Sequence, residues 1–314
     1  MSGRLRGRVV VVTGAGRGIG REYALLAAEH GASVVVNDLG ASLDGATVED
    51  SPAAHVVDEI RAAGGRAVAD GNDISDWEGA KALIDRAVSE FGDLHVLINN
   101  AGIMRDRMMF NMSVEEWDAV IAVNLRGHFA PTRHAAAYWR EEEKAGRGAD
   151  RVVISTSSVS GLRGSIGQVN YGTAKAGIAT FAQLVDRELN EKYGVRSYAI
   201  APGARTRLTL STPHAAKTVG LAAPEGEWDS KSPANVAPFV IWLADAACPM
   251  PSGNVFGVAG GKVELYKTWS IAEQIDGERE WTLEELDEAV RPLLDAAPSR
   301  VRSVVEAAAS GPRA

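Results

Sequence analysis

Two patterns of apolar residues alternate along the chain and predict its secondary structure. Short runs rich in β-branched residues span 8–13, 33–37, 94–99, 151–155, 195–201 and 254–258. These runs are apolar throughout, which is typical of strands that are covered on both faces. Stretches with apolar residues at helical spacing lie between them, at 20–30, 52–63, 77–91, 114–140, 170–193 and 233–245. The alternation predicts right-handed crossovers and an α/β fold, a doubly wound parallel sheet with helices on both faces.

Two segments depart from this alternation. Residues 39–51, after the second strand, form a loop rich in Gly, Asp and Ser that either overhangs a bound ligand or is a solvated insertion. From Lys262 onward the strand pattern stops, and Thr282 is expected to cap a helix with one apolar face. That face packs against the same subunit, against a neighbouring subunit, or over the ligand site as a lid. We therefore expect an α/β domain over residues 1–261 and a helical C-terminal extension of the same domain over residues 262–314.

The composition is typical of a globular protein, and the charge argues against one class of binding partner. Of 314 residues, 46% are hydrophobic and 24% are charged, which is enough apolar material for a packed core. The 33 Lys and Arg against 41 Asp and Glu give a net charge of −8 without a basic block, which argues against a nucleic-acid partner. Cys248 is the only cysteine, so we expect neither an intrachain disulfide nor a thiolate zinc site. The apolar run 9–12 is too short for a signal peptide and no stretch approaches a membrane span, so we expect a cytoplasmic protein.

A glycine-rich turn follows the first predicted strand and leads directly into the first helix. It reads Thr13-Gly14-Ala15-Gly16-Arg17-Gly18-Ile19-Gly20. Glycines allow a tight turn and a close approach of the backbone, and free N–H groups at the start of a helix favour a pyrophosphate. This placement predicts a dinucleotide site, although Ile19 breaks the usual G-x-G-x-x-G spacing. The turn instead follows T-G-x-x-x-G-x-G, with Gly14, Gly18 and Gly20.

The end of the second strand indicates which nicotinamide cofactor is preferred. Asp38 stands there, where a carboxylate can accept hydrogen bonds from the adenosine ribose hydroxyls and repel a 2′-phosphate. The sequence therefore favours NAD over NADP.

Four polar residues form a candidate catalytic set. Tyr171 and Lys175 are four residues apart in a helical stretch, so both project from one face. Ser158 follows the strand 151–155, and Asn124 lies in the long predicted helix from residue 114. Each of them also has a purely structural interpretation, such as a cap, a helix kink or a solvated cation. Their joint presence in this order favours the chemical one.

The residue types suit hydride transfer between an alcohol and a nicotinamide, which also requires movement of the hydroxyl proton. A free phenol with a pKa of about 10 is a poor base at neutral pH. The ammonium of Lys175 and the positive charge of oxidised nicotinamide both favour the phenolate, so Tyr171 can act as general base or acid. Ser158 is expected to hydrogen-bond the substrate oxygen. This chemistry needs no metal.

Over residues 9–261 these motifs resemble the short-chain dehydrogenase/reductase family. The glycine turn matches the family's fingerprint, and Asn124, Ser158, Tyr171 and Lys175 match its catalytic residues. The resemblance implies a Rossmann-type fold and an oxidoreductase with NAD as cofactor. It also implies that Lys175 holds the nicotinamide ribose and that Asn124 orders a water through which the proton reaches solvent. Family members pair through the helices that correspond to 114–140 and 170–193, which implies a homodimer or homotetramer.

The resemblance extends to further cofactor contacts. Asp73-Ile74, which follows the strand-like residues 66–69, corresponds to a pair that contacts adenine, and Pro202-Gly203 to a motif beside the nicotinamide amide. Thr206 lies one position earlier than in many members, and Arg17 in some relatives holds a 2′-phosphate, which opposes the preference for NAD. The implied cofactor-binding residues are Gly14, Arg17, Gly18, Ile19, Gly20, Asp38, Asp73, Ile74, Asn100, Ala101, Gly102, Tyr171, Lys175, Pro202, Gly203 and Thr206.

One branch of the family is especially similar, the (3R)-hydroxyacyl-CoA dehydrogenase part of peroxisomal multifunctional enzyme type 2. The stretches that carry this similarity are 34–40, 100–107, 125–129 and 253–256. They imply a 3-hydroxyacyl-CoA or a related lipid- or sterol-derived substrate. Arg205 and Arg207 are candidates for contacts with a CoA phosphate.

Three alternatives stay open beside this interpretation. The first is a dehydrogenase of a free steroid or terpenoid alcohol. The second is a 3-oxoacyl carrier-protein reductase, against which Asp38 argues because such reductases usually take NADPH. The third is a nucleotide-binding sensor without catalytic activity, against which the complete set of four residues argues.

Overall fold

The structure is a computed structural model that describes residues 3–40, 51–211, 220–224, 226–267, 269–277 and 279–297. The chain divides into two compact units, Met1–Tyr266 and Lys267–Ala314. Most of the predicted loop 39–51, residues 41–50, lies outside the described residues. Among the described helices none is both long and apolar enough to cross a membrane.

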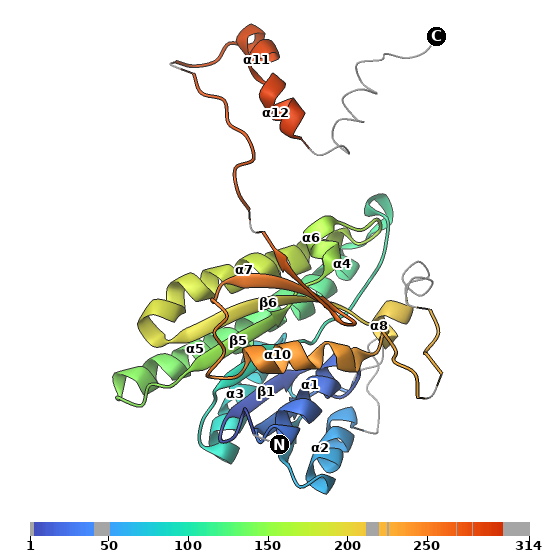
Figure 1. Ribbon diagram of the computed structural model, residues 1–314, viewed down its shortest axis with the longest axis vertical. Helices are drawn as coiled ribbons and strands as arrows, with labels where there is room; N and C mark the ends of the chain where they lie inside the picture. Colours follow the sequence, from blue (N-terminus) through green and yellow to red (C-terminus); the bar gives the residue numbers. More distant parts are fainter. Residues whose placement is uncertain are drawn as a thin grey trace. The chain divides into compact units, whose positions relative to one another are not determined.

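The described part of the first unit is built on one eight-stranded sheet, in the order β3-β2-β1-β4-β5-β6-β7-β8 (Figure 1). The strands are β1 (Val9–Thr13), β2 (Ser33–Asn37), β3 (Arg66–Asp70), β4 (Val96–Asn99), β5 (Arg151–Thr156), β6 (Val195–Gly203), β7 (Asn254–Ala259) and β8 (Lys262–Tyr266). All pairings from β3 to β7 are parallel, and β7 pairs with β8 antiparallel. The predicted doubly wound parallel sheet is therefore confirmed.

Helices cover both faces of this sheet. The helices described in this unit are α1 (Gly18–Glu29), α2 (Pro52–Ala62), α3 (Trp77–Phe91), α4 (Val114–Val120), α5 (Gly127–Lys144), α6 (Val159–Arg163), α7 (Val169–Tyr193), α8 (Arg207–Leu210) and α10 (Ala237–Leu243). Short 3-10 turns stand at η1 (Met109–Asn111) and η3 (Pro233–Asn235), and a π-helical turn, η2 (Ile121–Arg126), joins α4 to α5. The sequence predicted one continuous helix there.

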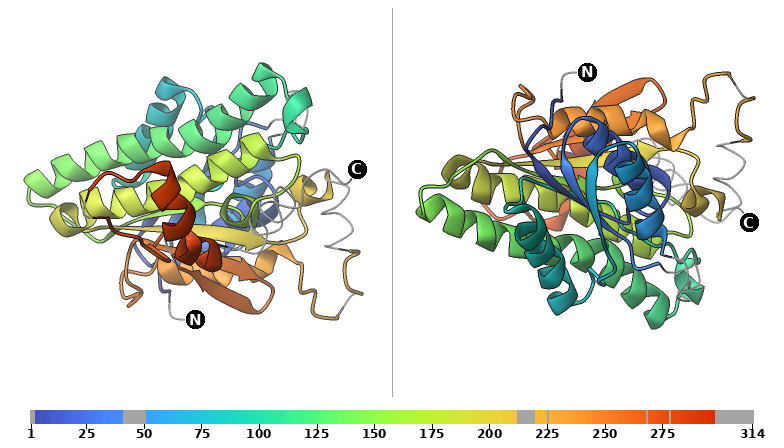
Figure 2. Two further views of the ribbon diagram at one scale, coloured as in Figure 1. Left: turned by 90° about the horizontal axis from the view of Figure 1, so that it is seen from above. Right: turned by 90° about the horizontal axis from the view of Figure 1, so that it is seen from below.

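Successive residues of each strand point to opposite faces, and this alternation creates two cores. Val10 and Val12 of β1 belong to a core with side chains of α1, α2 and α10. Val9 and Val11 belong to a second core with side chains of α3, α5 and α7. Figures 1 and 2 show the two groups of helices on their respective faces of the sheet. Because β1 is buried on both faces, its sequence is apolar at every position up to Thr13.

β8 differs from the expectation that the strand pattern stops at Lys262. Gly260 and Gly261 connect β7 to β8, Ala259 pairs with Lys262, and Gly260 has a φ of +58°. A Gly-Gly pair between two strands is a recognised signal of a two-residue hairpin. β8 escapes the apolar-run criterion because it is an edge strand, with Val263 49% and Leu265 64% exposed.

The second unit contains α11 (Leu283–Ala289) and α12 (Arg291–Ala296), so the predicted helical extension is present. Thr282 caps α11 as expected: its Oγ1 accepts the N–H of Glu285 at 3.2 Å, and the Glu285 carboxylate accepts the N–H of Thr282 at 2.9 Å. The predicted single helix is divided because a proline stands within the first two positions of α12. What its apolar face packs against stays a prediction.

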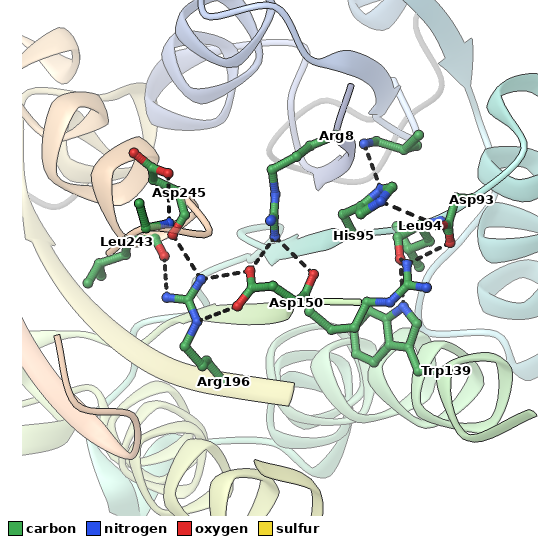
Figure 3. Close-up of polar contacts among 12 residues, drawn as sticks. Arg8, Asp93, Leu94, His95, Trp139, Asp150, Arg196, Leu243 and Asp245 are labelled. Atoms are coloured by element: carbon green, nitrogen blue, oxygen red, sulfur yellow. Dashed lines mark hydrogen bonds and ion pairs between the residues drawn. The ribbon is translucent and has the colours of Figure 1, made fainter. Parts of the chain in front are cut away.

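Ion pairs tie together the amino ends of the central strands (Figure 3). Asp150, just before β5, lies 2.8 Å from a guanidinium nitrogen of Arg8 and 2.9 Å from one of Arg196. Asp93, before β4, pairs at 2.6 Å with Arg151, whose side chain is only 2% exposed. These contacts fix the strands at the edge of the sheet opposite to their carboxyl ends.

Candidate active site

The carboxyl ends of the parallel strands meet at one edge of the sheet. β1 ends at Thr13, β4 at Asn99, β5 at Thr156 and β6 at Gly203. β1 pairs with β2 on one side and with β4 on the other, so the chain order of the strands reverses between β1 and β4. At such a switch point a crevice opens outside the carboxyl ends, and ligands of open α/β sheets bind there.

The glycine turn lies at this switch point and is too tightly packed for side chains. A Cβ on Gly14 would lie 2.7 Å from the Ala101 Cα, and one on Gly20 would lie 2.3 Å from the Gly14 carbonyl oxygen. Gly18 differs, because a Cβ there would have Thr206 as its nearest neighbour, at 3.7 Å. Gly14 and Gly18 both have a positive φ, +62° and +57°. Gly14 and Gly20 are therefore required by close packing, and Gly14 and Gly18 by the positive φ of the backbone.

The N-terminus of α1 fits an anionic group. Arg17 stands at the cap position, and its side chain makes no capping hydrogen bond. The N–H groups of the first turn, from Gly18, Ile19 and Gly20, have no partner within the helix, since the first four donors of any α-helix lack one. An uncapped helix end beside a closely packed glycine turn is what a pyrophosphate requires. The observed turn thus fits the predicted dinucleotide.

Asp38 lies beside this turn at the end of β2. Its Oδ2 accepts the N–H of Gly16 at 2.9 Å, and its Oδ1 accepts the N–H of Gly40 at 2.9 Å. Each carboxylate oxygen can accept a second hydrogen bond, so the side chain keeps capacity for ribose hydroxyls. Next to Gly16 lies a cavity of about 350 Å³, lined by Arg17, Arg21, Pro52, His55, Val56 and Glu59. The fingerprint did not single out Gly16, yet a Cβ there would lie 2.8 Å from the Asp38 carboxylate.

Asn100 joins the end of β4 to the glycine turn. Its side-chain amide donates to the carbonyl oxygens of Thr13 and Gly14, at 3.0 and 3.1 Å. The Thr13 hydroxyl accepts the backbone N–H groups of Asn100 and Ala101, at 2.9 and 3.1 Å. Sequence reasoning did not assign a role to Thr13, which here fixes the turn relative to β4.

The remaining predicted cofactor residues have identifiable structural partners. Asp73 accepts the N–H and the hydroxyl of Ser75, at 2.8 and 2.7 Å, and Ile74 is 5% exposed within the second core. Gly203, which follows Pro202 in β6, pairs with Ala259 of β7. Thr206 caps α8 by accepting the N–H of Thr209 at 3.2 Å. Their cofactor contacts stay predictions.

Asn124 and Lys175 converge beside Gly102. A Cβ on Gly102 would lie 2.6 Å from Asn124 Oδ1 and 3.5 Å from Lys175 Nζ. The Asn124 amide donates to the carbonyl oxygens of Ile103 and Val120, at 2.9 and 3.0 Å, while its Oδ1 is buried without a hydrogen-bond partner among the described residues. The π-helical turn η2 carries this asparagine, and such turns frequently occur at functional sites.

Tyr171 and Ser158 contact each other on the neighbouring side. Hydrogen bonding by Ser158 lowers the pKa of Tyr171, and the Tyr171 ring centroid lies 5.6 Å from Lys175 Nζ. Lys175 Nζ donates to the Thr156 carbonyl oxygen at 2.7 Å, which leaves two of its three donors for other partners. Ser158 also caps α6, with its Oγ accepting the N–H of Ser160 at 3.2 Å. The structure thus brings Ser158, Tyr171 and Lys175 together, and both Lys175 and Asn124 lie beside Gly102.

Burial has the largest effect on the pKa values of Tyr171 and Lys175. It raises the pKa of Tyr171 to about 12, against the lowering effect of the Ser158 hydrogen bond. It lowers the pKa of Lys175 to about 7. The sequence argument expected the lysine to lower the pKa of the phenol, whereas in the ligand-free protein removal from water has the larger effect.

Two other predictions concern charge and metals. Arg205 forms an ion pair with Asp229 and donates to the Leu221 carbonyl oxygen at 2.8 Å, so its charge is already partnered. Within the described ranges, no group of three or more His, Cys, Asp or Glu side chains could hold a metal ion.

Comparison with known proteins gives a consistent picture. A family model described as short chain dehydrogenase matches residues 8–214. A hydroxyacyl-CoA dehydrogenase, ChsB1, of Mycobacterium tuberculosis is 47% identical over 263 residues, which are 83% of this chain and 80% of that protein. The peroxisomal multifunctional enzyme type 2 of Mus musculus is 41% identical over 258 residues, 82% of this chain and 32% of the larger protein.

The fold comparison agrees with the sequence comparison. A crystal structure of a short chain dehydrogenase from Mycobacterium avium has a TM-score of 0.82 and 50% identity, covering 94% of this chain and 96% of that chain. The resemblance inferred from the motifs is therefore confirmed, including the similarity to the dehydrogenase part of the multifunctional enzyme. The chain belongs to the short-chain dehydrogenase family and is an oxidoreductase of the kind that binds NAD or NADP.

Proposed function

We propose that this protein is an NAD-dependent dehydrogenase that interconverts the secondary alcohol and the ketone of a 3-hydroxyacyl-CoA or a related lipid- or sterol-derived substrate. The observation that carries the proposal is the convergence of Asn124, Ser158, Tyr171 and Lys175 at the switch point of the sheet. The hydroxyacyl-CoA dehydrogenase of Mycobacterium tuberculosis, at 47% identity, supports the substrate class.

The cofactor is assigned to the glycine turn and to the residues around it. When bound, the nicotinamide accepts or donates the hydride. The N–H groups at the start of α1 hold the pyrophosphate, and Asp38 accepts hydrogen bonds from the ribose hydroxyls. The carboxylate of Asp38 also repels a 2′-phosphate, which favours NAD, while the guanidinium of Arg17 is the opposing charge. Asp73, Ile74, Pro202, Gly203 and Thr206 are proposed as adenine and nicotinamide contacts.

Tyr171 is the proposed general base in oxidation and the general acid in reduction. With a pKa of about 12 its hydroxyl is protonated in the ligand-free protein. The ammonium of Lys175 and the charge of an oxidised nicotinamide both favour the phenolate, so binding of the cofactor prepares the base. Ser158 donates a hydrogen bond to the substrate oxygen and stabilises the charge that develops there.

Lys175 and Asn124 provide the route of the proton. The two remaining donors of Lys175 suit the ribose hydroxyls and a water molecule. Asn124 Oδ1, close to the same point beside Gly102, can accept a hydrogen bond from that water. This arrangement supports the predicted transfer of the proton from Tyr171 to solvent.

The assembly and the location follow from the sequence and stay predictions. We propose a homodimer or homotetramer that pairs through α5 and α7, on which Phe129 and Leu184 are 44% and 49% exposed. A cytoplasmic location and the absence of a nucleic-acid partner are likewise expectations.

The proposal is tested by initial rates from nicotinamide absorbance. NAD and NADP are compared with (3R)- and (3S)-hydroxyacyl-CoA of several chain lengths, with a hydroxysteroid and with a terpene alcohol. Turnover of a thioester with NAD is expected. Activity only on a free alcohol would favour the steroid or terpenoid alternative, and a preference for NADPH with a 3-oxoacyl thioester would favour the reductase.

A further inference from the structure

The stretch Ile103-Met104-Arg105-Asp106-Arg107, hereafter the 103–107 segment, has no role in the function proposed above. It begins directly after Gly102, in the part of the chain that follows β4. One end of the segment contacts the site directly, because the Ile103 carbonyl oxygen accepts a hydrogen bond from the Asn124 amide at 2.9 Å. Its other end reaches the start of α7, the helix that carries Tyr171.

Three consecutive residues of this segment hold the first turn of α7. Asn170 Nδ2 donates to the Arg105 carbonyl oxygen at 3.0 Å. Gln168 Nε2 donates to the Asp106 Oδ2 at 2.9 Å. The Arg107 N–H donates to the Gly167 carbonyl oxygen at 2.7 Å.

These contacts continue to the backbone of Tyr171. Asn170 is fully buried, and its Oδ1 accepts the Tyr171 N–H at 2.7 Å. The Gln168 carbonyl oxygen accepts the N–H of Gly172 at 2.7 Å. The side chain of Gln168 caps nothing in α7, so its orientation depends on Asp106.

We propose that Asp106 is a positioning residue for the reaction: its hydrogen bond with Gln168 fixes the first turn of α7 and thereby the orientation of the Tyr171 phenol. The inference rests on the proposed role of Tyr171 as general acid and base. Asp106 does not itself contact the reacting atoms in this assignment, and it acts through Gln168 and the helix.

The carboxylate has a second effect, through its charge. Asp106 raises the pKa of Tyr171, while the hydrogen bond from Ser158 lowers it. Lys175 faces the ring from the same helix, and its charge is lost as the pH rises through about 7. Around Asp106, Arg105 and Arg107 are its chain neighbours, and the charge of Arg107 is paired with Glu116 at 2.6 Å. Loss of the Asp106 charge is therefore expected to ease ionisation of the phenol.

Two substitutions separate geometry from charge. Asp106→Asn removes the charge, but the asparagine carbonyl oxygen still accepts the Gln168 amide. Asp106→Ala removes both. Asp118→Asn is the matched control, because Asp118 is an exposed carboxylate on the adjacent α4.

The first readout is the pH dependence of kcat/KM for alcohol oxidation, which rises as Tyr171 ionises. In Asp106→Asn this rise is expected to move to lower pH by roughly half a unit, with kcat near the wild-type value. Asp106→Ala should show the same shift and, in addition, a loss of about tenfold in kcat, the size expected for one hydrogen bond. An unshifted profile in Asp106→Asn, equal to that of Asp118→Asn, would overturn the charge effect.

The second readout does not depend on activity. Hydrogen exchange of a peptide spanning residues 168–174 is measured by mass spectrometry in the ligand-free proteins. Faster exchange in Asp106→Ala, but not in Asp106→Asn or Asp118→Asn, supports the positioning role, and equal exchange in all variants refutes it. A wild-type protein without dehydrogenase activity would refute the proposed function, whereas the exchange measurement would still decide whether Asp106 holds the helix.

Discussion

At the scale of single residues, the site combines two ionisable side chains, Tyr171 and Lys175, whose charged forms are disfavoured by burial. Tyr171 is 8% exposed and Lys175 2% exposed, and both have a pKa displaced toward the neutral form. Such displaced values are typical of groups that exchange protons during catalysis. Two predictions concern these residues.

Replacement of Tyr171 by Phe is expected to reduce kcat by about 10² to 10⁴-fold, because the proton donor and acceptor is lost while the ring is kept. The thermal midpoint should change little, since the buried ring and its packing are kept. Steady-state rates and calorimetry check both statements. A Tyr171→Phe protein as fast as wild type on every substrate would falsify the mechanism.

Replacement of Lys175 by Met is expected to stabilise the ligand-free protein at acidic pH while abolishing activity. Folding lowers the pKa of Lys175 from 10.5 to about 7, so below pH 7 the folded and unfolded chains both carry the charge and the cost of burying it is complete. Between pH 7 and 10.5 the folded protein becomes neutral first, and this cost disappears.

The variant should therefore melt about 3 °C higher than wild type at pH 6, with a smaller difference at pH 10. Scanning calorimetry at the two pH values is the measurement. Equal differences at both pH values would mean that the buried charge is not the cause.

At the scale of elements, the two ends of the sheet have different tasks. The carboxyl ends carry the glycine turn and the candidate catalytic residues, and the amino ends carry the ion pairs of Arg8, Asp93, Asp150, Arg151 and Arg196. The ion pairs that stabilise the sheet and the candidate catalytic residues thus lie at opposite ends of the strands. This separation is testable by substitution.

Asp93→Ala is expected to cost about 2 kcal/mol of unfolding free energy, because it leaves the buried guanidinium of Arg151 without its carboxylate. The value is below that of a fully buried pair because Asp93 is 28% exposed. Asp85→Ala, which breaks an exposed pair with Lys81, should cost less than about 0.5 kcal/mol. Urea unfolding measures both, and kcat should be retained in both variants. A large loss of kcat in Asp93→Ala would mean that the two ends are coupled.

At the scale of the whole molecule, the exposed apolar residues of α5 and α7 predict self-association. Phe129→Glu is expected to shift a dimer or tetramer toward smaller species in sedimentation velocity, since a charge would be buried between subunits. Leu221→Glu is the control, because Leu221 is 95% exposed and lies outside these helices. A wild-type protein that sediments as a stable monomer contradicts the expectation.

The sequence by itself determined the order of strands and helices, the glycine turn and the set of four candidate catalytic residues, because each depends on local periodicity or on spacing along the chain. It did not predict β8, an edge strand whose exposed residues lack the apolar signature. It also placed Asn124 in a regular helix. In the structure Asn124 lies in a π-helical turn that packs against α7, and its amide donates to the Ile103 carbonyl oxygen. Hydrogen bonds between distant residues were equally inaccessible. Asp106 and Gln168 are 62 positions apart, and only the tertiary fold, which brings the segment after β4 to the start of α7, decides that they meet.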